Sequence, residues 1–301
     1  MEKIAIITDS CSDIKKEYRE LYDIHVLPIQ IQYDGKSYRD GVDITSNDIY
    51  AIQDEKVIKT SSPVGEDLFN LLDQLKDKGC THVIGLFLSS GISGTGNQMR
   101  LFCQTYEKLK CHIVDSQSAS VGLGVIAISL AKYREEGKSF DELIEIADFL
   151  CHQNYAYFSI DDLNYLQKGG RIGKASAFLG TTLKIKPILS FEKENGEIYV
   201  PAKVRGSKKV KSKLIDLIES HLEENPHQKF ALANADANKF GRKKYFGRNV
   251  KRKVSSIYIY NRWSCWCCFI LLSWFRTFRS SNSIFTRIKN IQGVLNIWVT
   301  K

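Results

Sequence analysis

Residues 82–95 read HVIGLFLSSGISGT, and they carry the clearest fold signal in the chain. Its first part, residues 82–88, is an apolar run typical of a strand buried on both faces of a parallel sheet. A loop of serine and glycine follows, and a helix is predicted from Thr95 onward. In open α/β sheets, ligands bind beyond the carboxyl ends of the strands. The stretch therefore predicts an α/β fold with a polar, ligand-facing loop at residues 89–95.

Strands and helices alternate on both sides of this stretch, which indicates βαβ units around a parallel sheet. We predict an α/β N-terminal domain with a parallel sheet over residues 1–155. The expected strands are residues 4–7, 25–33, 36–39, 57–60, 82–88 and 111–115, and the expected helices are residues 14–22, 45–52, 65–78, 95–109, 120–136 and 140–153.

The following residues are richer in hairpin signals, and the clearest is the turn Asn195-Gly196 between two β-type runs. They predict a smaller α+β second domain over residues 156–238. Its expected elements are strands at 157–159, 187–193, 197–204 and 230–234, and helices at 160–168, 174–179 and 208–224.

Residues 239–301 break the statistics of the chain. All 34 acidic residues occur by Asp236, and the residues after it hold 14 Lys or Arg and all four tryptophans. The net charge of +9 thus comes from the tail alone, and the preceding part is acidic. We therefore treat residues 239–301 as a separate, anomalous segment. The basic balance is no evidence that the rest of the protein binds nucleic acid.

The composition also excludes several classes of protein. The N-terminus MEKIAIITDS lacks the basic and apolar regions of a signal peptide. The apolar run from Cys265 is shorter than the ~20 residues that span a bilayer. The cysteines have no spaced histidine partners, so no metal site is predicted. We expect a cytoplasmic protein without an integral membrane segment, metal or cofactor.

Four polar, glycine- or serine-bearing segments are the candidates for chemistry: residues 8–10, 60–63, 89–95 and 169–174. Hydroxyls and backbone N–H groups at helix N-termini are natural anion sites. Each segment also has a plainer interpretation, as a capping turn, a helix entry or a glycine loop. The segment GGRIGK at 169–174 lacks the spacing of a phosphate-binding loop and follows a helix.

Together, these segments resemble the DegV family of bacterial fatty-acid-binding proteins. The resemblance lies in the order and spacing of the motifs from residue 1 to about 238. The matching stretches are TDS at 8–10 with Asp13, DGKSYRDG at 34–41, TSSP at 60–63, LSSGISGT at 88–95, VDS at 114–116, LNYLQKGGRI at 163–172 and KIKPIL at 184–189.

The resemblance implies a two-domain fold with a long-chain fatty acid, such as palmitate, between the domains. It implies that hydroxyls of Thr60, Ser61 and Ser93 hold the carboxylate. It further implies that a separate fatty acid kinase subunit receives the carboxylate and forms an acyl phosphate for phospholipid synthesis, with Arg171 at the mouth or the docking face. On this account the chain is not itself an enzyme, and its only ligand is the fatty acid.

Beyond Asn238 the resemblance fails. The family continues with a glycine-rich segment that contains a histidine near the carboxylate, but this chain has no histidine after His227. Codons for residues 261–267, read one nucleotide later, can spell Ile-Gly-Gly-Val-Val-Gly-Ala, which is the expected family segment. We interpret residues 239–301 as out of frame from near 238–241. The alternative is a genuine basic tail that binds nucleic acid or a membrane surface.

Two other functions stay open from the sequence. One is a stand-alone hydrolase or kinase that uses Ser93 or the loop at 169–174, although no G-x-S-x-G elbow is present. Turnover of an acyl ester or of ATP would favour it. The other is a nucleic-acid-binding protein, whose affinity would fall steeply with rising salt.

Overall fold

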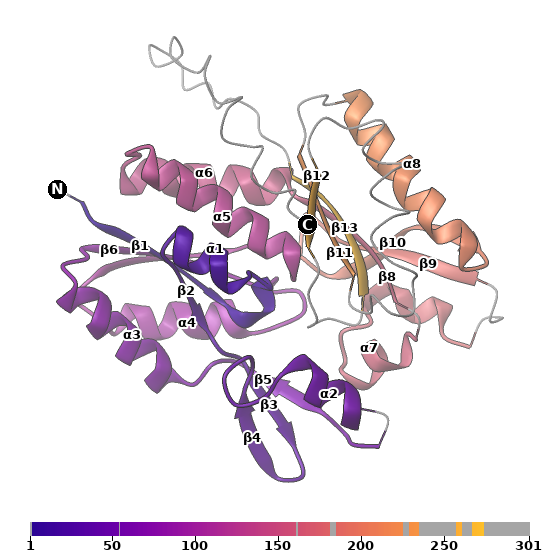
Figure 1. Ribbon diagram of the computed structural model, residues 1–301, viewed down its shortest axis with the longest axis horizontal. Coiled ribbons are helices and arrows are strands. Elements are labelled where there is room, and N and C mark those ends of the chain that lie inside the picture. The colour runs from indigo at the N-terminus through magenta and orange to yellow at the C-terminus, as the bar shows by residue number, and fades with distance from the viewer. Residues whose placement is uncertain are drawn as a thin grey trace.

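The architecture is that of a computed structural model. It describes residues 2–53, 55–160, 162–180, 185–224, 229–234, 257–260 and 267–273. Figure 1 shows two larger sheets with helices between and around them, and a small third sheet beside helix α2 (Ser46–Ile52).

The first sheet is wholly parallel, as predicted, with the strand order β2-β1-β6-β7. Its two central strands are buried almost throughout because helices cover both faces. The bounds are β1 Ile4–Asp9, β2 Ile24–Leu27, β6 His82–Phe87 and β7 Lys110–Asp115.

Side chains of β1 alternate between two apolar layers, since successive residues of a strand point to opposite faces. Ile4 and Ile6 pack toward helices α5 (Val121–Glu135) and α6 (Phe140–Gln153). Ala5 and Ile7 pack toward the opposite layer, which contains residues of α3 (Gly65–Asp77) and α4 (Thr95–Gln104).

The second sheet has six strands in the order β10-β9-β8-β13-β11-β12. Its pairs are antiparallel except for β11 with β12. The bounds are β8 Tyr155–Ile160, β9 Ile185–Phe191, β10 Ile198–Arg205, β11 Lys229–Asn234, β12 Ile257–Tyr260 and β13 Cys267–Ser273, with helices α7 Asn164–Lys168 and α8 Lys208–Glu224 and the 3-10 helix η2 Gly173–Phe178.

One hydrophobic core joins the two sheets. Helix α5 contacts β1 and β6 on one side and β11 and β13 on the other. Buried residues of α5 and α6 belong to the same cluster as Phe158, Leu189 and Ile198 of the second sheet. Because the cluster is continuous, unfolding of either sheet exposes apolar surface of the other.

A third, small sheet has the order β4-β3-β5, all antiparallel, and lies beside helix α2. Thr45 and Asp48 form a capping box at the start of α2. The bounds are β3 Gln30–Tyr33, β4 Lys36–Arg39, β5 Lys59–Ser61, α2 Ser46–Ile52, α1 Lys16–Leu21 and the 3-10 helix η1 Ser10–Ser12.

The single strand predicted over residues 25–33 is wrong. It is two strands, β2 in the parallel sheet and β3 in the small sheet, with Pro28 between them. Proline has no N–H to donate to a ladder, so pairing stops there. The next free amide, that of Ile29, donates instead to the Ser10 hydroxyl at 3.1 Å.

Other boundaries also differ from prediction. Ile160 belongs to β8, and α7 starts only at Asn164, whose amide donates to the Asp162 carboxylate at 2.9 Å. Residues 173–178 form a 3-10 helix, as in the 3.1 Å bond from the Ala175 amide to the Ile172 carbonyl. The hairpin of β9 with β10 and helix α8 are confirmed.

Two segments of the anomalous tail are strands of the second sheet. β13 pairs with β8 on one side and β11 on the other, in registers that include Phe269 opposite Phe158 and Ala233. The segment interpreted as out of frame thus contributes strands to the sheet, and the β-type apolar run at 267–273 accounts for β13. Asn238, Arg262 and the four tryptophans lie outside the described residues. The boundaries 1–155, 156–238 and 239–301 stay predictions.

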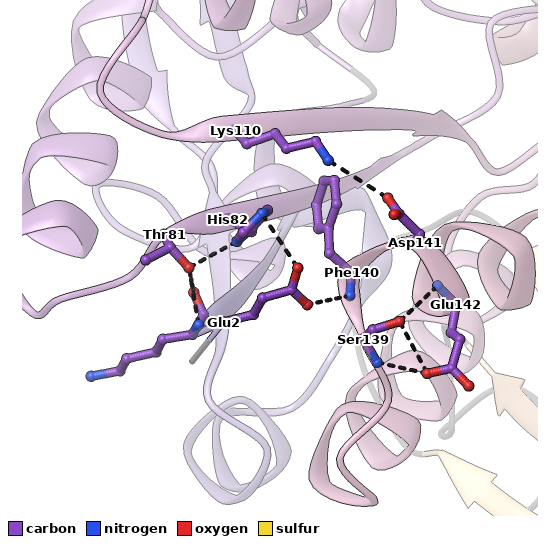
Figure 2. Close-up of polar contacts among 9 residues, drawn as sticks. Glu2, Thr81, His82, Lys110, Ser139, Phe140, Asp141 and Glu142 are labelled. Atoms are coloured by element: carbon purple, nitrogen blue, oxygen red, sulfur yellow. Dashed lines mark hydrogen bonds and ion pairs between the residues drawn. The ribbon is translucent and has the colours of Figure 1, made fainter.

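The amino-terminal edge of the first sheet is tied to α6 (Figure 2). Ser139 caps α6 in a capping box with Glu142, and the Phe140 amide donates to the Glu2 carboxylate at 2.8 Å. The Lys110 Nζ lies 3.6 Å from the Asp141 Oδ1, close enough for an ion pair. These contacts occupy the amino edge, and the polar loops lie at the opposite, carboxyl edge.

Candidate functional site

The carboxyl edge of the first sheet brings together loops that follow β1, β6 and β7. The buried Asp9 carboxylate at the end of β1 accepts the Leu88 amide at 3.0 Å and the Cys11 amide at 2.9 Å. The Ser89 amide donates to the Ser118 carbonyl at 2.8 Å. The predicted loop at residues 89–95 is therefore fixed at its start by two neighbouring strand ends.

A cluster of three hydroxyls lies at the other end of this loop. Ser93 Oγ is 2.9 Å from Thr95 Oγ1, and Thr95 Oγ1 is 3.1 Å from Ser62 Oγ. Thr95 is buried, whereas Ser93 and Ser62 are half-buried. Thr95 is also the first residue of α4, and the N–H groups of a first helical turn, together with the helix dipole, favour an anion. The cluster can thus donate several hydrogen bonds to one acidic group.

The predicted residues Thr60 and Ser61 lie in β5 and are exposed. Thr60 pairs with Ile31 of β3. The Ser61 hydroxyl accepts a hydrogen bond from the side-chain Nε2 of Gln32 at 3.4 Å. The structure therefore brings Ser93 together with Ser62, which the sequence reasoning missed as a site residue. No local pattern distinguishes Ser62 from its neighbours, because its partner Thr95 lies 33 positions further along the chain.

Arg171 is exposed and lies directly after the glycine turn that ends α7. Its Nε donates to the Ile92 carbonyl at 3.0 Å, and its Nη1 donates to the Gly169 carbonyl. The guanidinium is therefore hydrogen-bonded to the backbone of Ile92, the residue immediately before Ser93. Among the hydrogen bonds of the described residues, Arg171 is the only residue of the 169–174 segment that bonds the loop at residues 89–95.

A separate polar cavity of about 190 Å³ lies beside the ends of β1 and β2. Ser12, whose hydroxyl is buried, lines it together with Arg19 and Asp40. On its wall, Asp13 accepts a 2.5 Å hydrogen bond from the buried Ser120 hydroxyl. Asp13 and Ser120 both have positive φ, at 51° and 54°. Backbone strain of this kind concentrates at functional sites, and here the hydrogen bond between Ser120 and Asp13 helps to hold it.

Burial raises the pKa of Asp9 to about 7, against the opposing effect of its two backbone N–H donors. Between about pH 4 and 7 the folded chain thus holds a proton that the unfolded chain has lost. The free energy of unfolding should fall as the pH rises through this range. Urea unfolding at several pH values measures this slope.

Asp9→Asn is the control, because asparagine cannot ionise and every other titrating group is kept. The variant should be less stable at pH 5, since its amide NH₂ faces one of the two donors. Its unfolding free energy should nevertheless decline less between pH 4 and 7 than that of the wild type. If the unfolding free energies of both proteins change equally with pH, the pKa of Asp9 is not raised in the folded chain.

Within the described part of the chain, no group of three or more His, Cys, Asp or Glu residues could hold a metal ion. No helix there has the length and apolar character needed to cross a membrane. Ser93 is bonded to another hydroxyl and to the Thr95 amide, which supply no base to activate it as a nucleophile. The geometry of the cluster suits binding of an acidic group.

The comparisons with known proteins bear on this architecture. The family model described as "Uncharacterised protein, DegV family" matches residues 3–250. The chain belongs to the DegV family. The match reaches beyond residue 238, where the sequence resemblance was expected to end.

Curated relatives agree with the assignment to the DegV family. One DegV domain-containing protein of Clostridium acetobutylicum is 41% identical over 224 residues, which are 74% of this chain and 80% of that protein. Another from the same organism is 37% identical over 251 residues, which are 83% and 88% of the two chains.

Solved structures share the DegV fold. A fatty-acid-binding DegV family protein of Thermus thermophilus has a TM-score of 0.80 at 25% identity, covering 90% of this chain and 99% of its own. DegV of Bacillus subtilis, described as a fatty acid binding protein, has a TM-score of 0.79 at 27% identity, covering 91% and 100%. The α/β class predicted from the sequence is thereby confirmed.

Proposed function

We propose that this chain binds a long-chain fatty acid, such as palmitate, with its carboxylate on the hydroxyls of Ser93, Thr95 and Ser62. The observation that carries the proposal is the hydroxyl cluster at the start of α4, in a chain whose solved relatives are described as fatty acid binding. Thr60 and Ser61, adjacent to Ser62, are the residues that the family resemblance implies. Their exposure makes Ser62 the stronger candidate of the three.

The chemistry of the cluster fits a fatty acid. Hydroxyls and helix N–H groups donate hydrogen bonds to a carboxylate without burying an unpaired cation. A long acyl chain supplies ~0.8 kcal/mol per buried methylene, on the order of 10 kcal/mol in all. Ordering the chain and losing its free motion offset much of this gain. The polar end then sets the orientation of the ligand more than its affinity.

We further propose that the bound carboxylate is presented to a separate kinase subunit, which forms an acyl phosphate for phospholipid synthesis in the cytoplasm. Arg171 supports this part, because it is exposed and bonded to the residue before Ser93. On this account, the chain alone forms no acyl phosphate. Acyl phosphate forms only when a fatty acid kinase subunit and ATP are added to the chain. Turnover of ATP or of an acyl ester by the chain alone would favour the enzyme alternative.

Ser93→Ala should weaken palmitate binding by about 1–3 kcal/mol, the range for leaving a buried polar partner unsatisfied. Ser62→Ala should have a similar effect and Ser61→Ala a smaller one, because only Ser62 reaches the cluster. Titration calorimetry with palmitate measures these affinities.

Ser212→Ala is the matched control, since Ser212 is an exposed helical serine whose hydroxyl bonds the Lys209 carbonyl in α8. It should bind palmitate as the wild type does. Equal affinities for Ser93→Ala and Ser212→Ala would exclude Ser93 from the site, and a larger effect of Ser61→Ala than of Ser62→Ala would favour the family-derived set.

A further inference from the structure

We propose that the turn between β9 and β10, residues 192–197, is the positioning element that holds Ser93 for its ligand. We call it the clamp turn. It belongs to the second sheet, whereas Ser93 follows a strand of the first. The inference rests on the proposed function, because it assigns the clamp turn a role in fatty-acid binding.

The clamp turn reaches the serine loop through Gly196. The buried Ser89 hydroxyl donates to the Gly196 carbonyl at 2.7 Å, and it accepts the Gly91 amide at 3.3 Å. A Cβ on Gly196 would lie 2.0 Å from Ser89 Oγ, and a Cβ on Gly91 would lie 2.3 Å from the Gly196 carbonyl carbon. Both contacts are closer than any side chain allows. Glycine is therefore required on each side of this junction.

The contact continues from Ser89 to Ser93. The Ser93 amide donates to the Ser89 carbonyl at 3.1 Å. On the other side, Arg171 donates to the carbonyl of Ile92 at 3.0 Å. Groups from the second sheet and its connections thus hold the backbone before Ser93 at two points. A hydroxyl that must meet a carboxylate within a few tenths of an ångström needs such support.

The clamp turn is itself anchored to the first part of the chain. Lys193 Nζ donates to the Cys151 carbonyl at 2.9 Å and also to the Asn154 carbonyl, at the C-terminus of α6. Nζ lies 4.8 Å from the ring centre of Tyr155. Burial lowers the pKa of Lys193 to about 8, so the side chain is still a cation at pH 7. A cation at a helix C-terminus is favourable, and it fixes where the turn meets Ser89.

Gly196→Ala tests the clamp turn. The added methyl group should push Ser89 away and raise the Kd for palmitate about tenfold. Gly206→Ala is the matched control, because Gly206 also has a positive φ, +87° against +69°, but nothing lies within 4 Å of its Cβ position. Both variants carry the same kind of backbone strain, so both melting temperatures should fall, and that of Gly196→Ala should fall further because of the clash. Only Gly196→Ala should lose affinity for palmitate.

A compensating variant separates positioning from general damage. Apart from Gly196 and its two chain neighbours, Ser89 Oγ is the only atom closer than 3.4 Å to the Cβ position at Gly196 among the described residues. Ser89→Ala/Gly196→Ala should therefore bind palmitate more tightly than Gly196→Ala, to within about threefold of Ser89→Ala. If Gly196→Ala does not fold, Ser89→Ala decides, since it removes only the hydroxyl and should raise the Kd about threefold to tenfold.

The outcomes distinguish this inference from the proposed function. Suppose that the wild type binds palmitate and that Ser93→Ala weakens the binding, whereas Gly196→Ala and Ser89→Ala do not. That result would overturn the role of the clamp turn but not the proposed function. Lack of palmitate binding by the wild type would overturn both. Weakened binding by Gly196→Ala with recovery in the double variant supports the clamp turn, and weakening without recovery contradicts it.

Discussion

Phe158→Ala should lower the free energy of unfolding by about 3–5 kcal/mol, the cost of deleting a buried aromatic ring and leaving its cavity. Phe158 is 2% exposed and lies in β8, between β9 and β13. Its ring centre is 5.4 Å from that of Phe191, and it belongs to the cluster that α5 and α6 share with the second sheet. Urea unfolding followed by far-UV circular dichroism measures the loss.

Phe69→Ala is the control, since Phe69 is only half-buried and packs against the other apolar layer. It should cost clearly less than Phe158→Ala. Both variants should unfold in one transition, because the shared core couples the two sheets. A loss no greater than that of Phe69→Ala, or a separate early transition in Phe158→Ala, would contradict a continuous core.

Gly124→Ala should lower the free energy of unfolding, although Gly124 lies inside helix α5. Alanine normally stabilises a helix interior by ~1 kcal/mol relative to glycine. At Gly124 of α5, however, the Cβ would lie 2.4 Å from the Ser12 carbonyl oxygen, a backbone atom that cannot rotate away. Overpacking costs about 1–3 kcal/mol, so the clash should outweigh the helix gain. Because η1 must shift, the Asp13–Ser120 contact should break as well.

Gly96→Ala is the matched control in α4. The nearest atom to its Cβ position is a side-chain carbon of Phe87 at 3.6 Å, which is ordinary contact. Thermal unfolding should place Gly96→Ala at or above the wild type and Gly124→Ala well below it. A Gly124→Ala protein as stable as Gly96→Ala would mean that α5 does not pack against η1 as described.

The local features of the fold were predictable from sequence because neighbouring residues determine them. The apolar run at 82–88, the Asn195-Gly196 turn and the periodic pattern of α8 each specify an element without help from distant residues. The family resemblance likewise pointed to the loop that bears Ser93. Pro28 also carried a local signal, the loss of an N–H, which the single-strand prediction over 25–33 overlooked.

The rest depends on contacts between residues far apart in the chain. Ser62 meets Thr95 across 33 positions, and Ser89 meets Gly196 across 107. Neither spacing is visible in a pattern of period 2 or 3.6, so Ser62 was passed over for Thr60 and Ser61. Gly196 appeared only as a turn residue, because its contact with Ser89 exists only once the two sheets pack together.

The tail shows the same limit. Its missing acids and its residues at 261–267 support the out-of-frame interpretation, which stays a prediction. The pairing of β13 with β8 and β11 depends on backbone groups, which any β-type run can supply. Sequencing of the gene across codons 235–245 tests the frame directly: an intact frame there would mean that β12 and β13 come from a genuine tail.

A crystal structure of the chain with bound palmitate would show where the carboxylate lies. We expect one carboxylate within about 3 Å of the hydroxyls of Ser93 and Ser62, beside the first turn of α4. We also expect that the Ser89 hydroxyl still bonds the Gly196 carbonyl in the complex. A carboxylate in the polar cavity beside Arg19, or palmitate bound nowhere near Ser93, would contradict the proposed site.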